Sequence, residues 1–149
     1  MNNPAAIRAI ADLFARQTLA VLATDMGGHP YASLVAFAAT ADLRRVVFAT
    51  IRTTRKFANL ELNSRVSLLV DNRSNTPADF QEAAAVTVMG QAAEPEGAER
   101  ERFAALYLSR HPYLEEFIAS PTCALFVIEV ERCVLVSRFQ NVAEITFPP

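Results

Sequence analysis

The sequence predicts a mainly β protein whose strands form a closed or nearly closed antiparallel barrel with peripheral helices. Short apolar, β-rich runs recur along the chain, turn residues separate them, and helical spacing is confined to one end and to connections. The chain has 149 residues, of which 52% are hydrophobic and 20% charged. These values predict one globular domain over residues 1–149.

The first third of the chain predicts a helix followed by three strands. Asn3 is the expected helix cap, Pro4 the expected first helical residue, and apolar residues at helical spacing continue to about Gln17. Gly27 and Gly28 give the strongest turn signal, because glycine readily adopts positive φ. The three strands, joined by short turns, predict an antiparallel meander at residues 19–24, 31–38 and 46–50.

The remainder is expected to combine further strands with helices in the connections. Gly90 is the expected site of a β-bulge, and residues 72–79 form a polar loop. The expected helices cover residues 54–63, 97–108 and the segment between Pro112 and Pro121. The expected strands cover residues 65–71, 85–93, 123–131, 134–139 and 142–147.

Composition argues against several classes of protein. A net charge of −2 does not favour a nucleic-acid or membrane-surface binder, so neither partner is expected. No secretory signal or membrane-length apolar run is evident, and a cytoplasmic location is expected. Cys123 and Cys133 lie outside any metal-binding motif, so no metal is expected and both cysteines are interpreted as small apolar strand residues.

A basic cluster stands where the third strand gives way to a helix. Arg52, Arg55 and Lys56 surround Thr53 and Thr54. Cations at a helix N-terminus oppose the helix dipole unless an anion binds there, and a phosphate is the obvious candidate. The alternative is a solvated basic turn in which Thr54 only caps the helix, and the cluster by itself favours neither.

Three ordered segments extend this interpretation: GGHPYASLVAFA, VVFATIRTTRK and NSRVSLLVD. Together they resemble the pyridoxamine 5′-phosphate oxidase-like FMN-binding split-barrel family, over roughly residues 18–95. The resemblance implies an antiparallel Greek-key split β-barrel, assembled as a homodimer with FMN at the dimer interface. A groove between two copies also suits a tricyclic ring that a small barrel cannot enclose.

The resemblance also implies individual cofactor-binding residues. In that family a Ser/Thr-Arg-Lys group grips the FMN phosphate, strand residues run beside the isoalloxazine ring, and the C-terminal tail reaches the partner's flavin. The implied residues are Ser33, Leu34, Val35, Thr50, Thr53, Thr54, Arg55, Lys56 and Arg138. For Leu34 and Val35 plain core packing is an equally good explanation of the side chains, and Arg138 is also explained as a surface cation.

The sequence departs from the true oxidases at several positions. Ser33 stands where they usually carry arginine, Ala49 where they carry an aromatic residue, and Ala85 where a flavin-contacting glutamine is expected. The chain has no tryptophan and lacks the Arg/His substrate motif. A vitamin B6 activity is therefore not expected.

The leading functional hypothesis is a flavoprotein oxidoreductase that uses FMN, with NADH or NADPH as a possible donor and no catalytic side chain assigned. The alternatives are a flavin store, a redox sensor or a haem-binding protein on the same barrel. His111 would be the haem ligand, although a cap or surface role is the simpler interpretation. A deazaflavin is a third possible cofactor.

Overall fold

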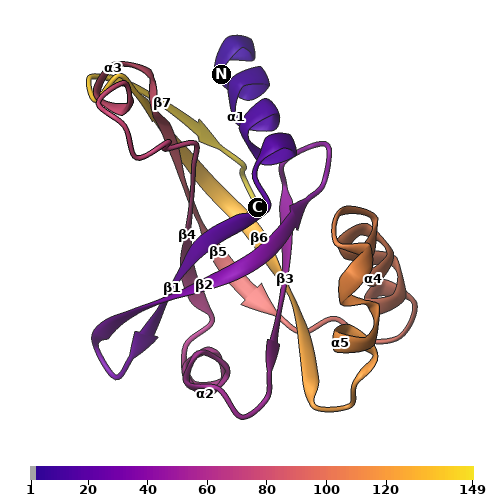
Figure 1. The fold of residues 1–149 in the computed structure, drawn as a ribbon. Coiled ribbons are helices and arrows are strands. Elements are labelled where there is room, and N and C mark those ends of the chain that lie inside the picture. The colour runs from indigo at the N-terminus through magenta and orange to yellow at the C-terminus, as the bar shows by residue number, and fades with distance from the viewer. Residues whose placement is uncertain (1–2) are drawn as a thin grey trace.

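The computed structural model describes residues 3–149 as a barrel of antiparallel strands with helices around it (Figure 1). The strands are β1 (Leu19–Met26), β2 (His29–Ala39), β3 (Arg45–Ile51), β4 (Arg65–Asp71), β5 (Ala84–Ala93), β6 (Cys123–Ser137) and β7 (Asn141–Thr146). The helices are α1 (Pro4–Arg16), α2 (Arg55–Leu62), α3 (Asp79–Glu82), α4 (Gly97–Arg110), the 3-10 helix η1 (Pro112–Leu114) and α5 (Glu115–Ala119).

Six strands close the barrel, which confirms the predicted fold class. The strand order is β3-β2-β1-β4-β5-β6, and β3 pairs with β6 to complete the circle, while β7 extends the sheet beyond β6. Every pairing is antiparallel. The spatial order β4-β1-β2-β3 is that of a Greek key.

The glycine turn has the geometry that the sequence predicts. Gly27 and Gly28 both have positive φ, 61° and 93°, and the Gly28 amide donates to Asp25 Oδ1 at 2.7 Å. Two left-handed residues match the twist of the flanking strands, so this turn fixes the register of β1 against β2. This register also determines which backbone groups of β2 do not bond to β1.

Helices α1 and α2 lie at opposite ends of the barrel (Figure 1). At the start of α1 the Asn3 side chain accepts hydrogen bonds from the amides of Ala5 and Ala6, as predicted for a cap. The apolar face of α1 joins the barrel core, where Phe14 meets Phe37 edge to face. Each end of the core is thus covered by a short amphipathic helix.

A second, smaller core lies outside the barrel. Helices α4 and α5 pack on the outer face of β3 and β6 through Phe103, Tyr107 and Ile118. Burial raises the pKa of the Tyr107 phenol well above its ordinary value. This helical layer covers only one side of the barrel (Figure 1).

The structure corrects two of the predicted elements. The expected strands at 123–131 and 134–139 are one continuous strand, β6. Its register against β5 slips by one residue opposite Met89 and Gly90. The slip leaves Glu131 and Arg132 exposed in succession between buried residues, which imitates a turn. The predicted bulge is therefore present near Gly90, but the extra residue belongs to β6. The short helix α3 was not expected.

Both cysteines are buried on β6 as free thiols, in agreement with their apolar interpretation. Among residues 3–149 no helix has both the length and the apolar character needed to cross a bilayer. The same residues contain no cluster of three or more His, Cys, Asp or Glu side chains suited to a metal ion.

Candidate functional site

The basic cluster lies where β3 ends and α2 begins, at the lower end of the barrel in Figure 1. Thr54 is the cap of α2, because its side chain accepts a hydrogen bond from the Phe57 amide at 3.3 Å. The Thr54 hydroxyl also lies 2.8 Å from Ile51 O and 2.8 Å from Thr50 Oγ1. These contacts fix the direction in which α2 leaves the strand.

Two cations at this helix end have no acidic partner. Arg55 and Lys56 are the first two residues of α2, and its first turn contains no acidic residue. Within residues 3–149 neither of them forms an ion pair. Their amides belong to the first turn, which has no carbonyl partner within the helix. Positive side chains, free N–H groups and the helix dipole all favour an anion here.

Arg52 does not belong to this free positive group. Its guanidinium makes two hydrogen bonds to the Glu94 carboxylate, one of them 3.0 Å long, and lies over the Phe57 ring. The sequence places Arg52 beside Arg55 and Lys56, but Glu94 is distant in sequence and only the fold brings it near. The candidate anion site therefore has two free cations rather than three.

Strands β2 and β3 separate beside this site. Their ladder contains three residue pairs, from Phe37↔Phe48 to Ala39↔Val46, although β2 continues to His29. Below the last pair β2 follows β1 while β3 descends towards α2 (Figure 1). We call the region in which the lower halves of β2 and β3 are not paired with each other the split.

Backbone groups of both strands point into the split. The Phe37 amide donates to Thr18 O on the β1 side. Along an antiparallel strand, successive residues turn their N–H and C=O groups alternately to one neighbouring strand and to the other. The N–H and C=O groups of Ala36 and Leu34 therefore point away from β1, towards β3. On β3, the Arg52 amide donates to Thr122 O on the β6 side, so the groups of Ile51 and Ala49 point towards β2 by the same alternation.

The three β2 residues implied by the family resemblance are placed differently from one another. Leu34 is 63% exposed on the outer face, and its backbone faces the split. Val35 is buried in the core, and Ser33 Oγ is buried without a hydrogen-bond partner. The backbones of Ser33 and Val35 face β1, so the structure brings only Leu34 into the split through its main chain.

Sequence reasoning missed the main-chain groups of Ala36 and Ala49. The signal that could have found them is the glycine turn, because a two-residue hairpin fixes which residues of β2 bond to β1. Thr50 is only 2% exposed, and its hydroxyl contacts Thr54. Thr50 therefore supports the helix cap, whereas the Thr53 side chain is exposed beside Arg55.

Arg138 lies far from this site within the chain. It occupies the turn between β6 and β7, where its amide donates to Ala83 O at the start of β5. Strand β4 begins directly after α2 and runs to that same end of the barrel. A role for Arg138 at the cofactor would therefore require a second copy of the chain.

The two histidines stand in different surroundings. His29 is exposed in the glycine hairpin. His111 is fully buried, with Nε2 2.7 Å from Phe37 O and Nδ1 without a partner. The surface role considered for His111 is therefore wrong, although it does follow the last residue of α4. Because its side chain is fully buried and Nε2 contacts a carbonyl, His111 is not presented to a ligand from solvent in this conformation.

The fold matches that of several solved structures. A haem-binding protein from Mycobacterium smegmatis superposes with a TM-score of 0.86 at 23% identity, covering 98% of this chain and 60% of that protein. An FAD-binding protein from Mesorhizobium loti has a TM-score of 0.66 at 19% identity, covering 86% of this chain and 91% of that protein. For a NimC/NimA family protein from Clostridium acetobutylicum the TM-score is 0.70 at 15% identity, covering 94% and 90%.

At these identities the likeness concerns the fold, and this chain spans only 60% of the M. smegmatis protein. No curated protein matches the sequence. Residues 6–137, however, match the family described as pyridoxamine 5′-phosphate oxidase. That match covers most of the 149 residues and agrees with the closed Greek-key barrel. The chain therefore belongs to the pyridoxamine 5′-phosphate oxidase family.

Proposed function

We propose that this protein is an FMN-binding flavoprotein that works as an oxidoreductase, with its cofactor at the interface of a homodimer. The observation that carries the proposal is the pair of unpaired cations, Arg55 and Lys56, on the acid-free first turn of α2. Family membership and an FAD-binding structural neighbour support a flavin. Bound FMN would supply hydride or electron transfer at its ring.

Different residues of the site suit different parts of FMN. Arg55, Lys56 and the free amides of α2 suit the phosphate, and the exposed Thr53 hydroxyl can add a further hydrogen bond. The main-chain groups of Leu34 and Ala36 in the split suit the polar edge of a planar ring, and Leu34 offers an apolar contact. No side chain of the site need act as an acid or base on this proposal.

The phosphate assignment can be tested by removing both cations. The Arg55→Ala, Lys56→Ala double variant should bind FMN roughly 100-fold or more weakly, because charge-assisted hydrogen bonds to the phosphate are lost. Its affinity for riboflavin, which has no phosphate, should be weak and unchanged. Titration with flavin fluorescence as the signal measures both affinities.

A matched control carries the same change in net charge elsewhere. Arg8→Ala combined with Arg102→Ala removes two exposed cations from α1 and α4 and should leave FMN binding intact. Equal affinity of the natural protein for FMN and riboflavin would mean that the phosphate site is misassigned.

The second candidate is a non-enzymatic flavin- or haem-binding protein, favoured by the haem-binding structural neighbour. Reduction of bound FMN by NADH or NADPH would support the enzyme, whereas spectral binding without turnover would support the store or sensor. A Soret band on haem titration would support haem binding. His111→Ala should not abolish that band, because the His111 side chain is fully buried and its Nε2 contacts a carbonyl.

A further inference from the structure

Two neighbouring side chains, Arg110 and His111, tie the end of α4 to the barrel. The Arg110 guanidinium donates to three main-chain oxygens at the end of α1, at 2.9, 3.1 and 2.9 Å, and these belong to Phe14, Ala15 and Gln17. The last carbonyls of a helix have no partner within it, so Arg110 caps α1 from a neighbouring element. It thereby fixes the segment that leads from α1 into β1.

His111 makes the second tie, to strand β2. Its imidazole is fully buried beside the Tyr107 ring, and Nε2 lies 2.7 Å from Phe37 O. A carbonyl oxygen can only accept a hydrogen bond, so Nε2 carries the proton. Nδ1 is left buried, with no hydrogen-bond partner in residues 3–149. Because such an atom lowers stability, packing alone does not account for a histidine here, and the bond to Phe37 is what the imidazole provides.

Phe37 is the residue at which β2 leaves β3, since the Phe37↔Phe48 pair is the last of their ladder before the split. The Phe37 carbonyl contacts His111 directly. The Phe37 amide donates to Thr18 O, just after the end of α1 that Arg110 caps. The end of α4 therefore restrains both main-chain groups of Phe37, one directly and one through α1.

The main chain held in this way is continuous with the groups proposed to meet the flavin ring. Ala36 and Leu34 direct their N–H and C=O groups into the split, and the Phe37 amide shares a peptide plane with the Ala36 carbonyl. Hydrogen bonds weaken steeply as their angle departs from linearity, so a rotation of this peptide would change what Ala36 can offer to a ring. Arg55 and Lys56 are on α2, at the other end of the split (Figure 1).

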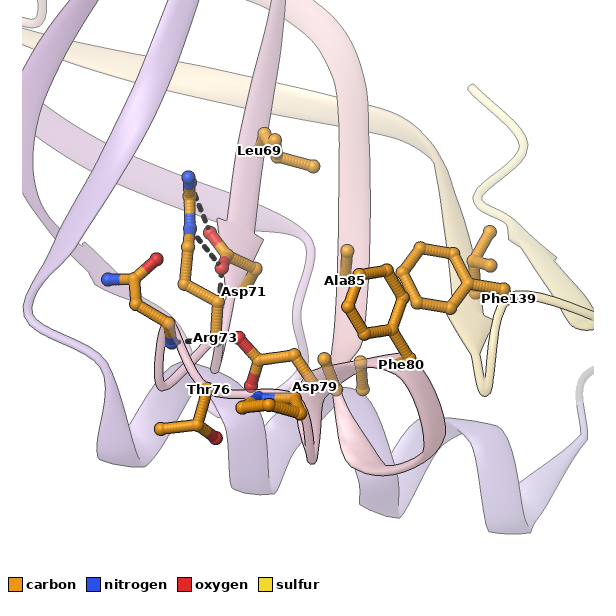
Figure 2. Close-up of a pocket in the computed structure, with 13 residues that line it drawn as sticks. Leu69, Asp71, Arg73, Thr76, Asp79, Phe80, Ala85 and Phe139 are labelled. Carbon is orange, nitrogen blue, oxygen red and sulfur yellow. Dashed lines mark hydrogen bonds and ion pairs between the residues drawn. The ribbon is translucent and has the colours of Figure 1, made fainter.

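The effect of His111 on a bound ring would be indirect. The cavity in Figure 2, of about 620 Å³, includes Ala85, where the true oxidases are expected to carry a flavin-contacting glutamine, so in the proposed dimer it belongs with the cofactor site. It is bounded by the end of β4, the start of β5 and the turn between β6 and β7. His111 does not line this cavity and its side chain is fully buried, so it can affect the ring only through the main chain of β2.

We infer that His111 is a positioning residue for the flavin ring: its hydrogen bond to Phe37 holds β2 at the angle that the ring edge requires, and Arg110 supports this from α1. The inference rests on the proposed FMN function and adds a residue that touches neither the phosphate nor the ring. Loss of this one hydrogen bond should weaken the hold on the ring and leave the phosphate contribution unchanged, because Arg55 and Lys56 lie on a different element.

Two substitutions at one position test the inference. His111→Phe keeps a ring in the buried site but has no donor, whereas the amide introduced by His111→Gln can still donate to Phe37 O. His111→Phe should bind FMN and riboflavin about tenfold more weakly, with the ratio of the two affinities unchanged, and His111→Gln should recover most of the loss. The visible spectrum and reduction potential of bound FMN should shift in His111→Phe and not in His111→Gln, because hydrogen bonds to the ring tune both.

Tyr113→Ser is the control, because Tyr113 is exposed and its ring centroid lies 6.3 Å from that of His111; it should leave every one of these readouts unchanged. Arg110→Met removes the cap on α1 and should weaken both flavins in equal proportion, which keeps the test open if thermal melting shows that His111→Phe does not fold. Equal losses in His111→Phe and His111→Gln, or an unshifted potential in a folded His111→Phe, would overturn the inference alone. A natural protein that binds no flavin would overturn the proposed function as well.

Discussion

At the scale of single residues, burial rather than residue type decides which groups can react. Cys133 is fully buried and Cys123 is nearly so. Removal from water raises the pKa of Cys123 and raises that of Cys133 to about 11, since burial disfavours the thiolate. Thr53 and Thr54 show the same contrast between residues of one type. Thr53 is exposed, whereas the Thr54 hydroxyl caps α2.

Both thiols should therefore resist labelling in the native protein at about pH 8, because the thiolate is the reactive form. A disulfide reagent such as 5,5′-dithiobis(2-nitrobenzoate) should modify both only in concentrated guanidinium chloride. Ionisation of Cys133 favours the unfolded chain, so stability should fall as the pH rises from the ordinary thiol pKa towards about 11. Rapid labelling of native protein would contradict the burial.

At the scale of elements, the junction between β3 and α2 determines whether an anion site exists. Thr54 joins the two elements by capping α2 and contacting Thr50 and Ile51. The cap fixes the position of the first turn of α2, so that Arg55 and Lys56 lie beside the split. A loss of this cap should therefore affect both the stability of the fold and the affinity of the site.

Thr54→Val should lower the free energy of unfolding by about 1 kcal/mol, because it removes the cap and leaves Thr50 without its partner. Thr54→Ser should restore most of that stability, since serine caps equally well. Thr53→Val is the matched control, because its side chain is exposed and should alter stability little. Urea denaturation measures all three, and equal losses in Thr54→Val and Thr53→Val would argue against the cap.

At the scale of the whole molecule, the helical layer leaves part of the barrel uncovered. Helices α4 and α5 cover the outer face of β3 and β6, whereas Leu34, Val21 and Leu69 lie side by side on the outer face of β2, β1 and β4. Leu34 is 63% exposed and Leu19 is 51% exposed. An apolar stripe of this kind suits the proposed dimer, which would also bring Arg138 of one copy to the other's cofactor.

The natural protein should therefore elute as a dimer, and Leu34→Glu should shift it towards monomer by burying a charge in the interface. Leu62→Glu, on the exposed face of α2, is the control and should not change the elution. Size-exclusion chromatography with light scattering measures the mass directly. A monomer in the FMN-loaded natural protein would contradict the dimer.

What the sequence determined was local: the capped first helix, the glycine hairpin, the β4 strand and the TTRK turn. Each depends on neighbours along the chain, such as Asn3 before Pro4, or two glycines that adopt positive φ. The same local logic failed at β6, where a bulge at Glu131 exposed two successive residues and imitated a turn.

Only the tertiary structure decided the rest, because those contacts join residues far apart in sequence. It pairs Arg52 with Glu94 and so separates it from the proposed phosphate site, and it buries His111 against Phe37. It also opened the split between β2 and β3 and set Phe80 beside Phe139. Long-range packing and strand register control which groups are free to bind, and periodicity along a single sequence does not encode them.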